Sequence, residues 1–352
     1  MIKKFWKNKK VLITGHTGFK GRWLSLILET FGANVYGISL ASNNTKTYYS
    51  LIERNFYFDI NDFDKLNKVI QKIKPDLIFH LAAQSLVLSG YKKIVDTYKT
   101  NFMGTINILE ASKISKSTKA LLITTTDKVY KNNAKNIFFH EDSELGGKDP
   151  YSASKAACEI AIQSYIKSNL TNHVNLASMR AGNVIGGDDF ASDRLMPDLI
   201  KYFQNKNNKK KKLIIRNPNS IRPWQYVLDV VNGYVNLAEK LYNNKKFVGS
   251  FNFGPNKNLT KIKVKQIVKE FQKYYNNKGN IIFKLNITNN KEEEKIFLAT
   301  KKIKKFLMFK NKINSFRNLI ERSIFVYNQV DKKNIKYRKK IYLDEIKKYN
   351  DE

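Results

Sequence analysis

Apolar and polar positions alternate with two different periods along the first half of the chain. Short apolar runs are separated by longer stretches whose apolar positions recur at helical spacing. The short runs predict strands over residues 10–15, 34–40, 76–83, 120–126 and 174–186, the last running into a loop. The longer stretches predict helices over residues 20–32, 62–73, 93–114 and 151–168. Strands that alternate with helices in this way predict an α/β fold built on a doubly wound parallel sheet.

The regular pattern ends after Gly186. Beyond it the chain is irregular, with turn-forming residues in NPNSIRP and FGPN. We therefore predict a Rossmann-type domain over residues 1–182, with a later contribution from about 226–254. Residues 183–225 and 255–352 are expected to form a smaller C-terminal lobe that binds the substrate.

The length and composition are those of an ordinary globular protein. A chain of 352 residues, 42% of them hydrophobic, can bury one large core, or one core and a smaller lobe. The longest apolar runs are far shorter than a membrane span, and the start lacks the apolar core of a signal peptide. We expect a cytoplasmic enzyme without a membrane partner. A single cysteine, Cys158, and four scattered histidines indicate neither a disulfide framework nor a metal site, and the apolar neighbours of Cys158 indicate buried packing.

The net charge of +34 is the abnormal feature of the composition. Such a charge is typical of proteins that bind nucleic acid or an anionic membrane surface. Here lysine is spread along the chain and is concentrated only in residues 205–212 and in the tail after Ser315. Dispersed lysines give solvated faces rather than a groove-shaped footprint, so we expect no nucleic-acid partner. The positive field is expected to attract a substrate that carries a pyrophosphate.

Three evenly spaced glycines follow the first predicted strand. In VLITGHTGFKGRWL, Gly15, Gly18 and Gly21 lie between that strand and its helix. Glycine allows the backbone to turn tightly and to approach a pyrophosphate, whose charge the helix N-terminus stabilises. This loop, which also contains Thr17, Phe19 and Lys20, therefore predicts a dinucleotide-binding site.

A second motif predicts acid–base chemistry on a helix. Tyr151 and Lys155 are four residues apart, so both project from one helix face. We expect the ammonium of Lys155 to lower the pKa of Tyr151, because a nearby positive charge favours the phenolate. Tyr151 would then take a proton from a sugar hydroxyl while hydride passes to a nicotinamide.

The stretch TTTDK adds ionisable groups at the end of a parallel strand, where α/β sheets place their sites. It places Thr126, Asp127 and Lys128 upstream of Tyr151. Oxidation and reduction of a sugar carbon do not require the two additional groups. Asp127 and Lys128 therefore suggest a second proton-transfer task.

The spacing Gly-x-x-Gly-x-x-Gly resembles that of the extended short-chain dehydrogenase/reductase family. Within it, the motifs are most similar to those of the CDP-glucose 4,6-dehydratases, over most of the chain to about residue 255. These motifs are TGHTGFKGRWL, FHLAAQSLV, TNFMGT, TTDKVY, DPYSASK, SMRAGNVIGGDDFASDRLMPD, IIRNPNSIRPWQYV and NFGP. The chain departs from the family at Ser85 and Leu88, where proline and arginine are usual, and at Tyr226, which replaces a histidine.

The resemblance implies an NAD-dependent lyase. The hexose would be oxidised at C4, lose water across C5 and C6, and receive the hydride at C6, as a step in making deoxysugars for surface polysaccharides such as lipopolysaccharide. Thr126 would hydrogen-bond the reacting oxygen beside Tyr151. Asp127 would protonate the leaving C6 hydroxyl, and Lys128 would act at C5.

The resemblance also implies binding residues. Asp59 would contact the adenine, although it could equally cap the following helix; the other cofactor positions are Ile60, Leu81, Ala82 and Ala83. The positions expected to bind the nucleotide sugar are Gln84, Asn183, Arg194, Leu195, Arg216 and Arg222. The second predicted strand ends with neither the acid typical of NAD sites nor the arginine typical of NADP sites, so only the resemblance favours NAD. The resemblance also implies a homo-oligomer, a dimer or a tetramer, assembled through the helices near 93–114 and 151–168.

Two alternatives remain at this stage. A nucleotide-sugar epimerase, or a dehydratase acting on another nucleotide hexose, would use the same scaffold. An RNA-binding member of the fold would account for the basic charge. An epimerase would leave Asp127 and Lys128 without a role, and an RNA-binding protein would also leave Tyr151 and Lys155 without one.

Overall fold

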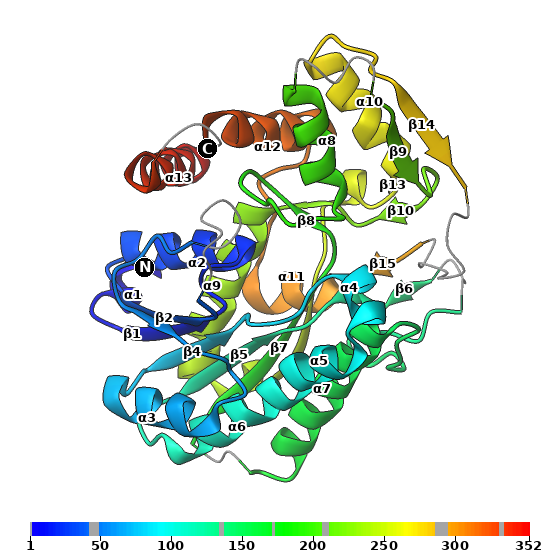
Figure 1. Cartoon of the computed structure of the whole chain (residues 1–352). Helices are drawn as coiled ribbons and strands as arrows, with labels where there is room; N and C mark the ends of the chain where they lie inside the picture. The colour runs from blue at the N-terminus through cyan, green and yellow to red at the C-terminus, as the bar shows by residue number, and fades with distance from the viewer. Residues whose placement is uncertain are drawn as a thin grey trace.

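A computed structural model describes residues 2–41, 49–133, 137–170, 173–205, 211–285, 295–330 and 334–352. Within these residues the chain folds around a seven-stranded sheet whose neighbouring strands are all parallel (Figure 1). The strand order is β12 (Gly249–Phe253), β7 (Asn175–Ala181), β5 (Ala120–Thr124), β4 (Leu77–His80), β1 (Lys10–Thr14), β2 (Asn34–Ser39) and β3 (Asn55–Tyr57). The order runs outward from β1 in both directions, which confirms the predicted doubly wound sheet.

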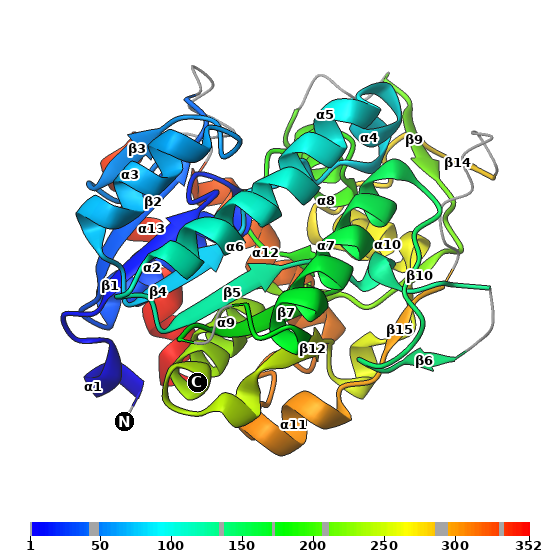
Figure 2. The same cartoon turned by 90° about the horizontal axis from the view of Figure 1, so that it is seen from below.

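Helices cover both faces of the sheet (Figure 2). One layer contains α2 (Phe19–Thr30) and α9 (Val227–Asn243), and the other contains α3 (Phe63–Ile73), α6 (Gly104–Ile114) and α7 (Pro150–Lys167). Successive strand residues face opposite layers: Val11 and Ile13 join the core cluster on the α2 side, whereas Leu12 joins the one on the α3 side. Burial on both faces explains why these strands read as continuous apolar runs.

Two elements differ from the sequence prediction. Strand β3 has only three residues and none of them is fully buried, so it gives no apolar run. The helix predicted over 93–114 is continuous, but it contains a π-helical turn, Lys99–Met103, between α5 (Ile94–Tyr98) and α6. That turn holds Asn101, whose side chain hydrogen-bonds the backbone of Gln84 at 2.8 Å and 3.0 Å.

A smaller lobe lies beyond the carboxyl edge of the sheet (Figure 1). Its elements are α8 (Leu195–Gln204), β9 (Leu213–Arg216), β10 (Ile221–Arg222), β13 (Ile262–Lys263), α10 (Val264–Tyr274), β14 (Ile281–Lys284) and α12 (Phe316–Val330). The remaining short elements are α1 (Ile2–Trp6), α4 (Val87–Lys92), β6 (Phe138–Phe139), β8 (Val184–Ile185), β11 (Gln225–Tyr226), β15 (Phe297–Leu298) and the 3₁₀ turns Asp127–Val129, Lys245–Phe247 and Lys257–Leu259.

The C-terminal third does not belong entirely to this lobe, which differs from the predicted division. Helix α11 (Lys301–Leu307) packs on β12 and α9, and α13 (Ile335–Asp351) packs on α2 and α12. The ring of Tyr342 in α13 lies 4.0 Å from that of Trp23 in α2, centroid to centroid. Buried tyrosines and an isoleucine on one face of α13 pack this helix against the Rossmann-type domain, although the sequence around them is rich in lysine.

Two further expectations concern burial. Cys158 is fully buried, and its thiol contacts the backbone oxygens of Asn101 and Ser154, which confirms a packing role. Across the part of the chain that the structure describes, every helix is too short or too polar to span a bilayer. The basic segment 205–212 lies largely outside the described residues.

A buried ion pair fastens α7 to the sheet. Glu159 of α7 and Arg180 of β7 are both fully buried, with 2.8 Å between Oε2 and Nη2. The carboxylate of Glu159 also accepts hydrogen bonds from Thr125, Ser178 and Ser250. Burial alone would raise the pKa of Glu159, but the charge of Arg180 and these hydrogen bonds outweigh it and hold the pKa below its usual value.

We predict that Glu159→Gln lowers the free energy of unfolding by about 3–5 kcal/mol, because it leaves the charge of Arg180 buried without a counter-charge. Denaturation in urea measures the change, and Glu321→Gln, at the exposed pair with Arg317, serves as the control with little expected effect. The stabilisation by Glu159 is present above the unfolded-state pKa and is lost as the pH falls through the lower folded-state pKa. Equal stability of the two variants would contradict this prediction.

Candidate active site

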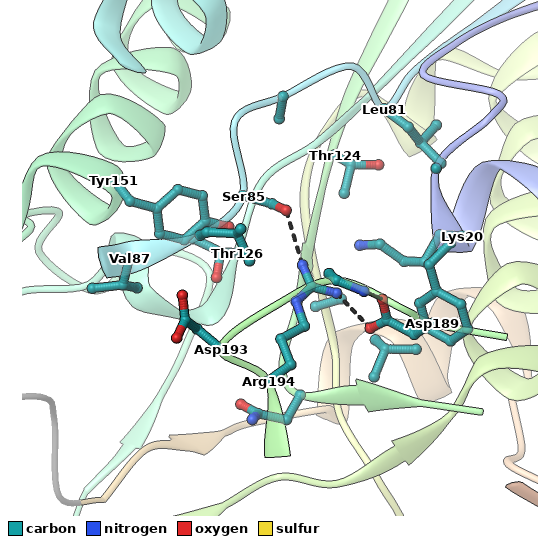
Figure 3. A pocket seen from close by; sticks show the side chains of 18 of the residues that line it. Lys20, Leu81, Ser85, Val87, Thr124, Thr126, Tyr151, Asp189, Asp193 and Arg194 are labelled. Carbon is teal, nitrogen blue, oxygen red and sulfur yellow. Dashed lines mark hydrogen bonds and ion pairs between the residues drawn. The ribbon is translucent and has the colours of Figure 1, made fainter. Parts of the chain in front are cut away.

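A cavity of about 750 Å³ lies at the carboxyl ends of the central strands, below the smaller lobe (Figure 3). Its lining includes all the residues predicted to bind the dinucleotide: Gly15, Thr17, Gly18, Phe19, Lys20, Gly21, Asp59, Ile60, Leu81, Ala82, Ala83, Tyr151 and Lys155. It also includes Thr126, Asp127 and Lys128. Residues that are far apart in the sequence therefore share one space.

The glycine-rich loop fits the pyrophosphate of a dinucleotide. Gly15 has φ +75°, and a Cβ there would lie 2.7 Å from the backbone nitrogen of Ala82. A Cβ on Gly21 would lie 2.2 Å from the oxygen of Gly15, so β1 and α2 approach each other too closely for any other residue. Gly18 is the N-terminal cap of α2 and has no side chain to cover the free backbone N–H groups. This arrangement leaves the helix N-terminus open to an anion.

The cofactor end of the cavity resolves one of the open interpretations. The cap of α3 is Asp62, whose side chain accepts from the backbone of Lys65. Asp59 instead accepts from the backbone and the side chain of Asn61 and lines the cavity. The helix-cap interpretation of Asp59 is therefore wrong, and its adenine contact stays a prediction. Residues 39–41 at the end of β2 also line the cavity, and residues 42–48 lie outside the described part of the chain.

The residues after β5 form a compact polar turn. Thr126 caps the 3₁₀ turn Asp127–Val129, and its hydroxyl donates to Oδ1 of Asp127 at 3.1 Å. The side chain of Thr126 also lies beside the phenol of Tyr151 and opposes the rise of its pKa. Thr126 therefore lies between the phenol of Tyr151 and the carboxyl of Asp127.

The expected effect of Lys155 on Tyr151 is wrong for the protein that the structure describes. Burial raises the pKa of Tyr151 to about 12, although the neighbouring hydroxyl of Thr126 and the charge of Arg194 oppose the rise. The ammonium of Lys155 donates to the backbone oxygen of Thr124 at 3.1 Å, and burial lowers the pKa of Lys155. Loss of water from around the phenolate thus outweighs the attraction of the nearby charges.

Asp127 has the character of an acid. Its carboxyl is buried, and among the described residues Oδ2 has no hydrogen-bond partner. Burial raises its pKa, while the charges of Lys128 and Arg222 partly offset the effect. A raised pKa favours the protonated form, which can donate a proton to a leaving group.

Lys20 of the glycine-rich loop has electrostatics that the motif did not predict. Burial of its ammonium, together with the positive charges of Arg194 and Lys155, lowers the pKa to about 7 against the opposing charge of Asp127. Its Nζ lies 5.8 Å from the centroid of the Tyr234 ring. Figure 3 shows the side chain pointing into the cavity.

The predicted substrate residues Asn183, Arg194, Leu195, Arg216 and Arg222 also line the cavity. Arg194 bridges two loops: Nη1 donates to Asp189 at 2.7 Å and Nη2 to Ser85 at 2.8 Å (Figure 3). Gln84 does not belong to the lining. Its side chain instead hydrogen-bonds Leu86 and Thr97, which holds the loop that carries Ser85.

Some lining residues were not predicted. Asp189 and Asp193 lie in a motif that was quoted, but without a role assigned to them. Tyr327 comes from α12, in the lysine-rich third where the sequence offers no motif. Its hydroxyl donates to the backbone oxygen of Asp189 at 2.8 Å, a contact between residues 138 positions apart. No local pattern can reveal such a contact.

Known proteins resemble the chain in sequence and fold. CDP-glucose 4,6-dehydratase of Salmonella typhimurium is 44% identical over 265 residues, which are 72% of this chain and 73% of that protein. dTDP-glucose 4,6-dehydratase of Haemophilus influenzae is 28% identical over 72% of this chain and 77% of that protein.

Two solved structures share the fold. The dTDP-glucose 4,6-dehydratase DesIV of Streptomyces venezuelae, solved with NAD, has a TM-score of 0.77 at 18% identity and covers 91% of this chain and 97% of its own. UDP-glucose 4-epimerase of Thermus thermophilus, also with NAD, has a TM-score of 0.76 at 21% identity and covers 91% and 99%. The family model described as GDP-mannose 4,6 dehydratase matches residues 12–323. The chain therefore belongs to this dehydratase family of extended short-chain dehydrogenases/reductases.

Proposed function

We propose that the chain is an NAD-dependent hydro-lyase that converts CDP-glucose to CDP-4-keto-6-deoxyglucose. The observation that carries the proposal is the group of Tyr151, Thr126, Asp127 and Lys128, in which Thr126 hydrogen-bonds Asp127, in one cavity with a glycine-rich dinucleotide loop. The 44% identity to a CDP-glucose 4,6-dehydratase supports cytosine as the base.

The residues at the cofactor end would hold NAD in a defined order. Gly15, Gly18 and Gly21 would face the pyrophosphate, Asp59 the adenine, and Tyr151 and Lys155 the nicotinamide end. When bound, NAD supplies the oxidant that accepts a hydride from C4 of the hexose and returns it at C6. Lys20, whose pKa is lowered to about 7, would gain positive charge beside a phosphate, because an opposite charge favours the ionised form.

The side chains of this protein move the protons. Tyr151 takes the proton of the C4 hydroxyl as the ketone forms, a step that requires its phenolate; the positive charge that bound NAD would bring to the nicotinamide end favours that form, against the raised pKa of the protein without NAD. The C5 hydrogen is then acidic, and Lys128 removes it as a proton while Asp127 gives a proton to the departing C6 hydroxyl, so that water leaves. Lys128 returns its proton to C5 when the hydride adds to C6. At the end Tyr151 holds an extra proton and Asp127 lacks one, and Thr126 lies beside both side chains.

Arginines would bind the rest of the substrate. Arg194, Arg216 and Arg222 lie on the lobe side of the cavity, where guanidinium groups suit the two phosphates of a nucleoside diphosphate. Asn183 would contact the glycosyl phosphate. Ser85, at a position where proline is usual in the family, accepts a hydrogen bond from Arg194 and helps to hold its guanidinium in place. The product would enter the synthesis of deoxysugars for surface polysaccharides.

We infer that two copies of the chain associate through α5 and α7. These helices contact each other and expose apolar side chains: Val95 is 78% exposed, Ile160 60% and Ile94 50%. Exposed apolar side chains that gather on adjacent helices are typical of an interface between protein chains.

Association through this face predicts a variant that separates the copies. Light scattering should give twice the mass of one chain for the unmodified protein. Ile160→Glu should raise the dissociation constant about tenfold or more, because it places a charge in an apolar contact. Leu285→Glu, at an equally exposed position on the lobe, is the control that should leave the mass unchanged. A monomeric unmodified protein would contradict the inference.

The substrate assignment predicts a defined product. Incubation of the NAD-loaded protein with CDP-glucose should give a product lighter by one water, without accumulation of NADH. CDP-, dTDP- and GDP-hexoses compared at one concentration measure the preference for the base, with product mass as the readout. Turnover of another nucleotide hexose but not of CDP-glucose would overturn the cytosine assignment, and a product of unchanged mass would favour an epimerase.

The roles of Asp127 and Lys128 predict a separation of oxidation from dehydration. Asp127→Asn keeps the shape of the side chain but cannot donate an acidic proton, and Lys128→Met keeps the apolar stem but cannot accept one. Both variants should still reduce the cofactor when the sugar binds, while water loss falls by about 10² or more. Tyr151→Phe is the matched control, because it should lose both steps.

Rapid-mixing absorbance of the nicotinamide and mass spectrometry of the product measure the two steps separately. Wild-type dehydration by both variants would contradict the assigned roles. Loss of cofactor reduction in both would show instead that Asp127 and Lys128 position the sugar.

A further inference from the structure

A cluster of buried polar side chains lies beside the glycine-rich loop and takes no part in the proposed chemistry. Arg22 of α2 is 1% exposed, and Asp188 and Tyr342 are fully buried. Tyr49 completes the cluster. Buried charges that serve only stability are often replaceable by apolar residues, so a cluster of this kind invites a functional explanation.

The cluster joins the two halves of the cavity. The hydroxyl of Tyr342 donates to Oδ2 of Asp188 at 2.6 Å and accepts from Nε of Arg22 at 3.1 Å. Nε of Arg22 also lies 3.4 Å from Oδ2 of Asp188. The guanidinium donates to the backbone oxygens of Thr17 and Asp188 as well. Thr17 belongs to the dinucleotide loop and Asp188 to the loop that leads to Arg194, so one cluster sets the position of both.

The backbone at Asp188 is held in an unfavourable conformation. Its φ is +69°, in the left-handed region that non-glycine residues seldom adopt. The preceding Gly187 is packed so tightly that a Cβ would lie 2.2 Å from side-chain atoms of Val326. Strained backbone of this kind persists only where its surroundings impose it, and it concentrates at functional sites.

Asp188 is joined directly to the residue that holds Arg194. Asp189, the next residue, holds the guanidinium of Arg194 at 2.7 Å. Its backbone is fixed in turn by the hydroxyl of Tyr327, which accepts from the nitrogen at 3.2 Å and donates to the oxygen at 2.8 Å. A shift at Asp188 would therefore move Arg194 within the cavity.

We propose that Tyr342 is a positioning residue of the active site: its hydroxyl holds Asp188 and thereby presents Arg194 to the diphosphate of the substrate. The inference rests on the proposed function, because it requires Arg194 to bind a nucleoside diphosphate. It gives helix α13 a role in substrate binding that its lysine-rich sequence does not reveal.

Helix α13 offers a matched control for this inference. Tyr349 lies on the same buried face, and its hydroxyl donates to Asp229 at 2.6 Å. Both tyrosines therefore attach α13 to the body of the protein through a buried carboxylate, but only Tyr342 contacts the loop of Arg194. Tyr342→Phe keeps the ring against Trp23, so the packing of the helix survives.

The test compares Tyr342→Phe and Tyr349→Phe in the NAD-loaded protein. We expect Tyr342→Phe to raise KM for the nucleotide sugar about tenfold with kcat nearly unchanged, because it weakens a contact present before and during the reaction. Tyr349→Phe should keep KM within about twofold of wild type, whatever it does to thermal stability. Calorimetric titration with CDP alone should show the same difference in affinity.

The outcomes separate this inference from the proposed function. An unchanged KM for Tyr342→Phe, or an equal rise for both variants, would overturn the inference while leaving the proposed function intact. Failure of the unmodified protein to turn over or bind any cytidine, thymidine or guanosine diphosphate hexose would overturn the proposed function, and the inference with it.

Discussion

The buried ion pair between Glu159 and Arg180 sets the geometry on which the candidate site depends. Tyr151, Lys155 and Glu159 are each four residues apart, so they form one row along α7. The third member is fixed to the sheet, through Arg180 and through Thr125 at the end of β5. Tyr151 and Lys155 are thereby held beside the carboxyl end of β5. The phenol of Tyr151 meets Thr126 because helix and strand are fixed to each other one turn below the cavity.

Desolvation shifts the pKa of four ionisable groups in this cavity in the direction of the neutral form. It raises the pKa of Tyr151 and of Asp127, and it lowers the pKa of Lys155 and of Lys20. Each shift favours the neutral form. A carboxyl that keeps its proton can act as a general acid. A lysine that has lost its proton can be protonated again when an anion binds beside it. A substrate with two phosphates would bring that negative charge into the cavity, beside the arginines on its lobe side.

The sequence predicted the parts of this structure that local patterns encode. Long, fully buried strands gave apolar runs, and Gly15, Gly18 and Gly21 were recognisable because close backbone packing admits no side chain there. Strand β3 was missed because three residues, two half-buried and one exposed, give no period. The raised pKa of Tyr151 was missed because it follows from burial by the whole fold.

The contacts of the C-terminal third could not be predicted for a different reason. Tyr342 and Asp188 are 154 positions apart, and Tyr327 and Asp189 are 138 apart. Pairs of this kind follow no period, and Tyr342 stands among lysines that suggest an exposed surface. Helix α13 therefore seemed to belong to the lobe, although its buried face of Tyr342, Ile346 and Tyr349 returns it to the dinucleotide domain.

The central claim is that one cavity carries out oxidation, loss of water and reduction on the same sugar. Transfer of deuterium from C4 of labelled CDP-glucose tests it most directly, with the position of the label in the product determined by NMR. The account predicts a product lighter by one water that carries the deuterium at C6. Deuterium that returns to C4 in a product of unchanged mass, or that is lost to the solvent, would contradict it.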